Sequence, residues 1–294
     1  MLFSDLQNKI KDYAKTLDFG KASKQLEKEV FSLKKDEFLP IIAQIGIIPE
    51  NIRHDSTEEK LYAKVSDIVL AKCFNELNMK AIVLQERANS ADVYVESLYH
   101  NYSLVADAKA FRLSRTAKNQ KDFKVESMVH WKGENDYAVL CCPYFQYPKS
   151  SSQIYGSALT GNVSLFSWEY FSIMLQTGIK ETASINLSSI WNQSAVFAKR
   201  TSVSKENECF LEKQNLAIMN ELNISQDDFQ KAFGVFKADI IKRGADEITY
   251  WKNVIKDINS YSKEQAVKEL ISALKLNEKI KYIEKYIGCL KAMK

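Results

Sequence analysis

Residues 104–111 read LVADAKAF, an apolar run that carries two opposite charges two positions apart. Successive side chains of a β-strand alternate between its faces, so Asp107 and Lys109 point the same way if this run is a strand. An acid and an amine on a mostly buried strand are costly to keep dry and unpaired. The run therefore predicts a central strand whose polar end is paired or binds a ligand.

A second β-rich run, ADVYV at residues 91–95, lies upstream and brings a further acid, Asp92. The polar residues 99–102 (YHNY) between the two runs are typical of a hairpin turn, which predicts antiparallel neighbouring strands. Asp92 then meets Asp107 and Lys109 at one end of a sheet. Two carboxylates and a lysine suit a Mg²⁺ site for phosphodiester hydrolysis, because Mg²⁺ usually takes one or two protein carboxylates beside phosphate and water.

The D-x-K triplet by itself is a weak signal. It recurs at residues 122–124, and E-x-K occurs at 58–60. From spacing alone, an ordinary ion pair at a strand end is the better explanation of Asp107 and Lys109. The surroundings change this balance, because only this copy lies in an apolar strand and follows another strand that carries an acid.

A strongly basic segment follows the candidate strand, and Asn119 and Gln120 lie within it. Its basic residues recur every three positions and are Arg112, Arg115, Lys118, Lys121 and Lys124. Such a run is usually a solvated helix face, and Thr116 is placed to cap a helix running toward Trp131. Beside a nuclease site we favour DNA contact instead, because Lys and Arg suit phosphates while Asn and Gln suit the adenine edge.

Three further acids are candidates for assisting the site. Glu59 stands three residues after Ser56 at the start of a helical pattern, where a capping box is the favoured interpretation and is compatible with assistance at the site. Glu86 lies in a polar turn, for which a surface position is favoured. Asp122 belongs to the second D-x-K triplet, inside the basic segment.

The pattern Asp92…Asp107-Ala108-Lys109 resembles the PD-(D/E)xK nucleases, although Ala91 stands where the name of that superfamily has a proline. Residues 104–125 are more specifically similar to the HindIII family of type II restriction endonucleases. Further similar blocks lie at residues 45–50, 67–72, 136–140, 145–148 and 201–204. The blocks keep their order and nearly their spacing, and the resemblance is looser toward both ends of the chain.

The resemblance implies a Mg²⁺-dependent homodimer that binds double-stranded DNA and cuts both strands of the palindrome AAGCTT within a restriction-modification system. It implies metal binding by Asp92 and Asp107 and a catalytic role for Lys109. Two other functions stay open: a structure-specific repair or junction nuclease, and a non-catalytic DNA-binding regulator. The base-reading candidates argue against the first. The acids argue against the second, because a pure binder has no use for carboxylates that face phosphates.

Composition bounds the class of protein. The chain of 294 residues is 46% hydrophobic, which is ordinary for a globular protein, and its net charge of +4 does not by itself identify a nucleic-acid binder. Five cysteines without a C-x-x-C pair predict a reducing compartment with neither a disulfide framework nor a zinc ribbon. No run approaches the ~18 apolar residues of a membrane span. We expect a cytoplasmic protein without a membrane partner.

The order of patterns from residue 58 to 176 is helix, strands, helix, two strands and helix. Residues 137–142 are apolar throughout, which predicts a strand buried on both faces. This order favours an α/β fold with a mixed central β-sheet, flanked by helices as in restriction-endonuclease cores. We expect one domain, 1–294, with a helical N-terminal layer at 1–55, the catalytic core at 56–192 and a helical C-terminal layer at 206–294.

Overall fold

The computed structural model describes residues 2–84, 90–115, 120–148, 152–198 and 210–292. The chain divides into two compact units, Met1–Lys242 and Arg243–Lys294. The expected division of one domain into a core and two helical layers stays a prediction.

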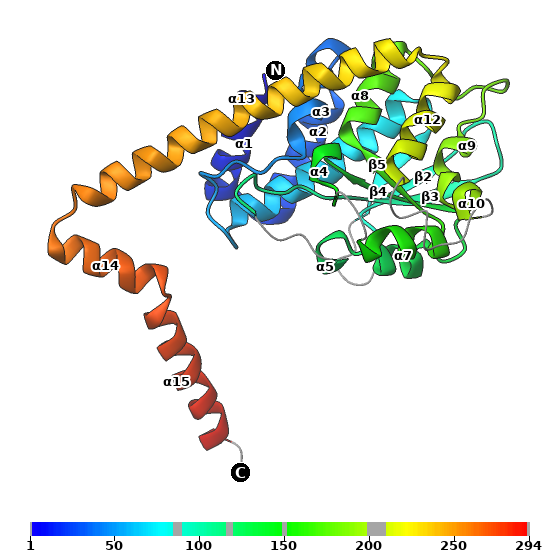
Figure 1. Cartoon of the computed structure of the whole chain (residues 1–294). Helices are drawn as coiled ribbons and strands as arrows, with labels where there is room; N and C mark the ends of the chain where they lie inside the picture. The colour runs from blue at the N-terminus through cyan, green and yellow to red at the C-terminus, as the bar shows by residue number, and fades with distance from the viewer. Residues whose placement is uncertain (1, 85–89, 116–119, 149–151, 199–209, 293–294) are drawn as a thin grey trace. The chain divides into compact units, whose positions relative to one another are not determined.

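A five-stranded sheet forms the centre of the first unit (Figure 1). Its strands, in spatial order, are β1 (Lys80–Val83), β2 (Val93–Glu96), β3 (Ser103–Ala108), β4 (Tyr137–Cys142) and β5 (Val163–Ser167). The pairs β1–β2 and β2–β3 are antiparallel, whereas β3–β4 and β4–β5 are parallel. This mixed sheet with helices around it confirms the predicted α/β fold class.

Helices occupy most of the remaining described chain in this unit. They are α1 (Phe3–Thr16), α2 (Phe19–Phe31), α3 (Lys35–Ile45), α4 (Thr57–Glu76), α5 (Gln120–Phe123), α6 (Val125–Lys132), the 3₁₀ helix η1 (Tyr144–Gln146), α7 (Gln153–Gly161), α8 (Trp168–Thr177), α9 (Ser188–Trp191), α10 (Gln193–Ala198), α12 (Phe210–Leu222) and the start of α13 (Gln226–Asn259). Helix α4 packs against β1, β2 and β3, while α6 and α7 contact the parallel part of the sheet. Figure 1 shows α4 and α7 on opposite sides of the strands.

The sheet separates two apolar cores, and the alternation along β4 shows how. Val139 and Cys141 belong to the core on the α4 side, whereas Ala138, Leu140 and Cys142 belong to the core beneath α6 and α7. All five side chains are fully buried. This confirms the prediction that the strand is buried on both faces, as expected for a strand inside the parallel part of a sheet.

The helix expected from Thr116 toward Trp131 is not one helix in its described part. Helix α5 ends at Phe123, and α6 begins at Val125. Between them Lys124 adopts a left-handed conformation with φ 53°. Phe123 is fully buried between the rings of Phe111 and Tyr147. The helix breaks next to this buried ring. The spacing of basic residues describes only the exposed surface of a helix, so it did not predict the break.

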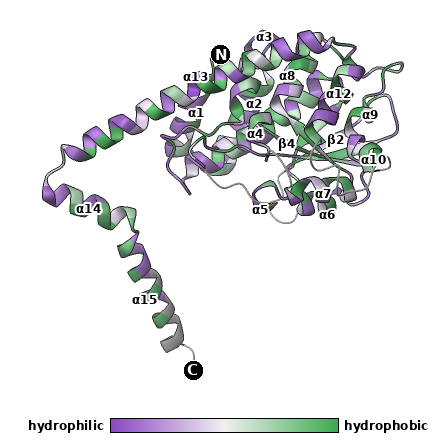
Figure 2. Ribbon diagram, viewed as in Figure 1, coloured by the Kyte–Doolittle hydropathy of each residue, from purple (hydrophilic) through white to green (hydrophobic). Residues whose placement is uncertain are grey.

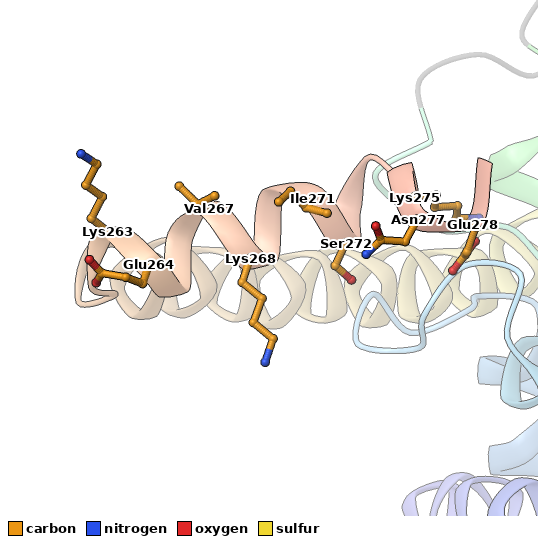
Figure 3. Close-up of a pocket in the computed structure, with 9 residues that line it drawn as sticks. All are labelled: Lys263, Glu264, Val267, Lys268, Ile271, Ser272, Lys275, Asn277 and Glu278. Atoms are coloured by element: carbon orange, nitrogen blue, oxygen red, sulfur yellow. The ribbon is translucent and has the colours of Figure 1, made fainter. Parts of the chain in front are cut away.

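The second unit consists of helices only, among the residues described there. It contains the end of α13 (Gln226–Asn259) together with α14 (Lys263–Ala273) and α15 (Leu276–Ala292). Apolar and polar residues alternate along these helices (Figure 2). Between α14 and α15 lies an open groove of about 720 Å³ that includes Val267 and Ile271 (Figure 3). None of the helices in the described chain is both long and apolar enough to cross a membrane.

Large apolar side chains are exposed on this second unit, and α14 has no buried residue. The exposed ones are Ile248, Trp251, Ile255, Ile258, Tyr261, Val267, Leu270, Leu274, Leu276, Ile280, Ile283 and Ile287. Among the residues of this unit that the structure describes, none belongs to either apolar core. An isolated helix as short as α14, with 11 residues, is marginal in water, and exposed apolar faces of this kind are typical of an interaction surface.

Candidate active site

The two acids predicted to meet do come together at one end of the sheet. Strands β2 and β3 are antiparallel with Val93 opposite Ala106. One step further along this register, Asp92 immediately before β2 faces Asp107 near the end of β3. This confirms the predicted hairpin. It also explains the meeting of the acids, because the start of one antiparallel strand lies beside the end of its neighbour.

A third carboxylate, from Asp67, joins this end of the sheet. Asp67 lies in the middle of α4, and one ligand oxygen from each of Asp67, Asp92 and Asp107 lies within 4.8 Å of the others. The Asp67 Oδ1 atom accepts a long hydrogen bond from the backbone N–H of Ala108, with 3.4 Å between the two atoms. We call these three residues the acid cluster. It joins helix α4 to both acid-bearing strands.

Sequence reasoning did not single out Asp67 as a site residue, although a signal was present. The acid interrupts the apolar residues of α4, in which nearly every position from Leu61 to Phe74 is buried. A helix that is apolar on all sides is a core helix, and a charge inside it needs a partner or a ligand. The covering helix α4 therefore brings an acid onto the end of the sheet.

Lys109 takes the position predicted for it. Its Nζ atom forms an ion pair with the Asp107 carboxylate, as expected for side chains on one face of a strand. The backbone N–H of Lys109 donates to the carbonyl oxygen of Cys141 at 2.7 Å, which extends the ladder to β4 beyond the end of β3. This contact fixes the lysine backbone, and the lysine side chain is only 15% exposed.

A second lysine, Lys64, also reaches the acid cluster, and sequence reasoning missed it. Its Nζ atom lies 3.7 Å from Asp92 Oδ1 and donates to the carbonyl oxygen of Leu84 at 3.0 Å. Lys64 lies one helical turn before Asp67 on α4, so the two side chains project from the same face of the helix. The cluster thus contains three carboxylates with an amine at either side.

The acid cluster is crowded and largely withdrawn from water. Asp67 and Asp107 are 6% and 1% exposed, whereas the side chain of Asp92 is 38% exposed. Burial, followed by the charges of the two other acids, raises the pKa of Asp67 well above its usual range. Burial and the charge of Asp107 also raise the pKa of Asp92. A cation bound between the three acids offsets the repulsion between their negative charges. Carboxylate oxygens are also the donors that Mg²⁺ prefers.

The acid near the start of α4, Glu59, lies apart from the acid cluster. Ser56 caps the helix by accepting from the N–H of Glu59, at 3.1 Å. The Glu59 carboxylate accepts from the N–H of Asp55 at 2.7 Å and forms an ion pair with Arg112. Glu59 precedes Asp67 by eight residues, or about 12 Å of helix. A role for Glu59 in assisting catalysis stays a prediction.

Two arginines of the predicted DNA-binding segment form contacts within the protein. Arg112 is only 16% exposed and, besides its ion pair with Glu59, donates to the carbonyl oxygen of Ile52 at 2.7 Å. Arg115 forms an ion pair with Asp122, so the second D-x-K triplet begins with an acid that is held by an arginine on its own segment. This arrangement does not resemble the acid cluster.

The remaining residues of that segment are only partly described. Lys121 and Lys124 are exposed, and the Lys124 Nζ atom lies 5.8 Å from the centre of the Trp131 ring. Gln120 opens helix α5. Lys118 and Asn119, as well as the candidate assisting acid Glu86, lie outside the described residues. Their predicted roles, like those of the described members, stay predictions.

Glu169 is a buried acid in the first turn of α8, directly after β5. It is 5% exposed, and its Oε2 atom accepts from the backbone N–H of Tyr144 at 2.9 Å. Burial raises the pKa of Glu169 from 4.5 to about 7, although hydrogen bonds to the carboxylate oppose the shift. The protein therefore holds this carboxyl group protonated under mildly acidic conditions.

We expect Glu169 to make the folded protein less stable as the pH rises. The pKa of Glu169 is higher in the folded chain than in the unfolded chain. The protonated carboxyl group therefore favours the folded state fully below pH 4.5, and this contribution to the free energy of unfolding is lost as the pH rises to about 7. Glu169→Gln should therefore be more stable than the wild type by about 3 kcal/mol at pH 8.5, with little difference at pH 4.5. Urea unfolding at both pH values measures this. Parallel profiles for wild type and variant would contradict it, and the exposed Glu134→Gln is the control.

Two comparisons with known proteins each match nearly the whole chain. A family model described as HindIII restriction endonuclease matches residues 5–286. The type II restriction enzyme HindIII of Haemophilus influenzae is 40% identical over 275 residues, which cover 94% of this chain and 92% of that protein. The match extends over both strands of the acid cluster and helix α4. The chain therefore belongs to the HindIII restriction endonuclease family.

Proposed function

We propose that this chain, a type II site-specific DNA endonuclease of a restriction system, hydrolyses phosphodiester bonds with Mg²⁺ bound at Asp67, Asp92 and Asp107. The observation that carries the proposal is the meeting of these three carboxylates beside Lys109, at one end of the sheet. Three oxygen donors within 4.8 Å fit a small hard cation. As a restriction endonuclease the chain depends on a divalent metal, and Mg²⁺ is our choice among such ions.

Each residue of the site has a distinct task in this mechanism. Asp92 and Asp107 offer oxygen ligands from neighbouring strands, and Asp67 adds a ligand from the covering helix. When bound, the divalent ion neutralises charge on the scissile phosphate and lowers the pKa of an attacking water. Lys109 orients that water or helps to deprotonate it, and its ammonium group opposes the negative charge that develops on the phosphate.

We assign DNA recognition to the basic segment that follows β3. Lys121 and Lys124 are exposed there and suit phosphate contacts, while Arg115 is partly exposed. Asn119 and Gln120 suit the adenine edge in the major groove. The proposed target is the palindrome AAGCTT, which rests on the likeness to the HindIII enzyme. We place the enzyme in the cytoplasm, where its DNA substrate lies.

A plasmid digestion tests this function directly. Incubation with Mg²⁺ should give discrete fragments whose ends map to one palindrome, and EDTA should abolish them. Smearing or nicking without a fixed site would favour a structure-specific nuclease. An intact plasmid that still binds the protein would favour a non-catalytic regulator. Sequencing the fragment ends identifies the recognised bases.

We also propose that the enzyme acts as a homodimer. A two-fold dimer presents the same residues to both strands of a palindrome, so that each subunit cuts one strand. The exposed apolar faces of α13, α14 and α15 in the second unit supply surface that a second copy can cover. Sedimentation equilibrium should therefore give twice the mass of one chain at micromolar concentration. A monomer both free and on its DNA site would contradict the dimer.

A further inference from the structure

Lys64 connects helix α4 to the hairpin end that carries Asp92. Its Nζ atom lies 3.7 Å from Asp92 Oδ1 and donates at 3.0 Å to the carbonyl oxygen of Leu84. The lysine side chain is 15% exposed, so its amine is held among protein atoms. A lysine amine withdrawn from water in this way keeps its place only where oxygen partners compensate for lost hydration.

The two partners of Lys64 belong to one local structure. The backbone N–H of Leu84 donates to the carbonyl oxygen of Asp92 at 2.8 Å, one step beyond the last paired residues of β1 and β2. Lys64 therefore binds one residue of this pair through its backbone oxygen and the other through its carboxylate. The Lys64 amine therefore links the end of the paired strands β1 and β2 to helix α4.

Asp92 is the member of the acid cluster that most needs such a contact. Asp67 lies inside a buried helix and Asp107 inside a central strand, whereas Asp92 precedes its strand and its side chain is 38% exposed. The charges of the other two acids push its carboxylate away from the cluster. The Lys64 ammonium group beside Asp92 offsets that repulsion, as the Lys109 ammonium group does beside Asp107.

We propose that Lys64 is a positioning residue of the endonuclease, which holds the Asp92 carboxylate in the acid cluster so that it is ready to bind a divalent ion. This inference rests on the metal centre given under Proposed function, and it adds a residue outside the D…D-x-K pattern. Lys64 acts through Asp92, in the way that the hydrogen-bond partners of metal ligands set their orientation.

The sign of the effect on metal binding distinguishes this role from two others. A positioning lysine makes the ion bind more tightly. A lysine that merely competes with the ion as a positive charge makes it bind more weakly, so that its removal tightens binding. A lysine that contacts the DNA phosphate changes DNA affinity even when metal is absent.

The experiment compares Lys64→Met, Lys64→Arg and the control Lys60→Met, which removes an exposed lysine one turn earlier on α4. Calorimetry measures Ca²⁺ binding to each full-length protein in complex with a duplex that contains the mapped cleavage site. Lys64→Met should weaken Ca²⁺ binding roughly 10- to 100-fold, the usual range for losing a partner of a metal ligand. Lys64→Arg should recover most of the loss, and Lys60→Met should match the wild type.

Metal-free DNA affinity and the thermal midpoint in EDTA complete the test. In Lys64→Met the metal-free DNA affinity should stay close to wild type, because the lysine acts on the metal ligand. The thermal midpoint in EDTA should fall, because the cation that offsets the repulsion among the three carboxylates is gone. Unchanged or tighter Ca²⁺ binding by Lys64→Met would overturn the positioning role, as would a large loss of metal-free DNA affinity. If the wild-type complex binds no Ca²⁺ or Mg²⁺ at all, the metal centre itself fails, and this inference fails with it.

Discussion

Asp107→Asn should stop DNA cleavage and leave DNA binding intact. The substitution keeps the shape of the side chain and deletes the charge that, in our proposal, both holds the divalent ion and pairs with Lys109. We expect cleavage in Mg²⁺ to fall by at least roughly 1,000-fold, which corresponds to about 4 kcal/mol of transition-state stabilisation. Binding should persist, and should tighten when metal is absent, because one carboxylate fewer repels the phosphates.

The measurement separates binding from chemistry by using Ca²⁺ for binding and Mg²⁺ for cleavage. Asp92→Asn should behave like Asp107→Asn, since both serve the same ion. Asp122→Asn is the matched control, because it alters the other D-x-K triplet, whose acid is paired with Arg115. Some Mg²⁺-dependent cleavage should survive in that control. Cleavage at the wild-type rate by Asp107→Asn would refute the assigned site, and complete loss in Asp122→Asn alone would move it to the second triplet.

Asp67→Asn should have two effects of opposite sign. Cleavage should fall by about 100-fold, because the substitution removes the ligand that helix α4 supplies to the proposed ion. The metal-free protein should become more stable by about 1–3 kcal/mol, since one of three carboxylates that repel each other at close range is gone. An asparagine oxygen still accepts the hydrogen bond from the N–H of Ala108. The two effects together distinguish a metal ligand from a purely structural acid.

Urea unfolding in EDTA and cleavage in Mg²⁺ measure the two effects on the same preparation. Added Mg²⁺ should stabilise the wild type more than Asp67→Asn, because a ligand that binds only the folded state raises its stability by an amount that grows with the logarithm of the affinity. The exposed Asp36→Asn on α3 is the control for deleting a carboxylate elsewhere. Full cleavage by Asp67→Asn would reduce the proposed ligand set to Asp92 and Asp107.

The sequence by itself determined the part of the site that depends on neighbouring strands. Period-two alternation places Asp107 and Lys109 on one face, and a short hairpin connection makes the two strands antiparallel, which brings Asp92 to the same end. The unbroken apolar run of β4 likewise predicted its burial on both faces. These are local rules, because strand period and turn length are properties of adjacent residues.

Connections between elements were harder to predict. Helix α7 (Gln153–Gly161) lies between the parallel strands β4 and β5, and parallel neighbours require such a crossover. Its sequence, QIYGSALTG, has no strong helical period. Only the parallel pairing of β4 with β5 indicates that a helical crossover lies between them. The break at Lys124 has a similar origin, because the burial of Phe123 against Tyr147 involves residues distant in sequence.

Only the tertiary structure brought Asp67 and Lys64 to the site. Both lie on α4, upstream of every strand in the sheet, and they approach Asp92 and Asp107 because the apolar surface of the helix packs across β1, β2 and β3. The hydrophobic pattern of α4 predicts that the helix is buried. It does not predict the angle or the register at which the helix crosses the sheet, since these follow from the fit of side chains in the core. The sequence thus determined the strand pair and its acids, while packing decided which helix residues complete the cluster.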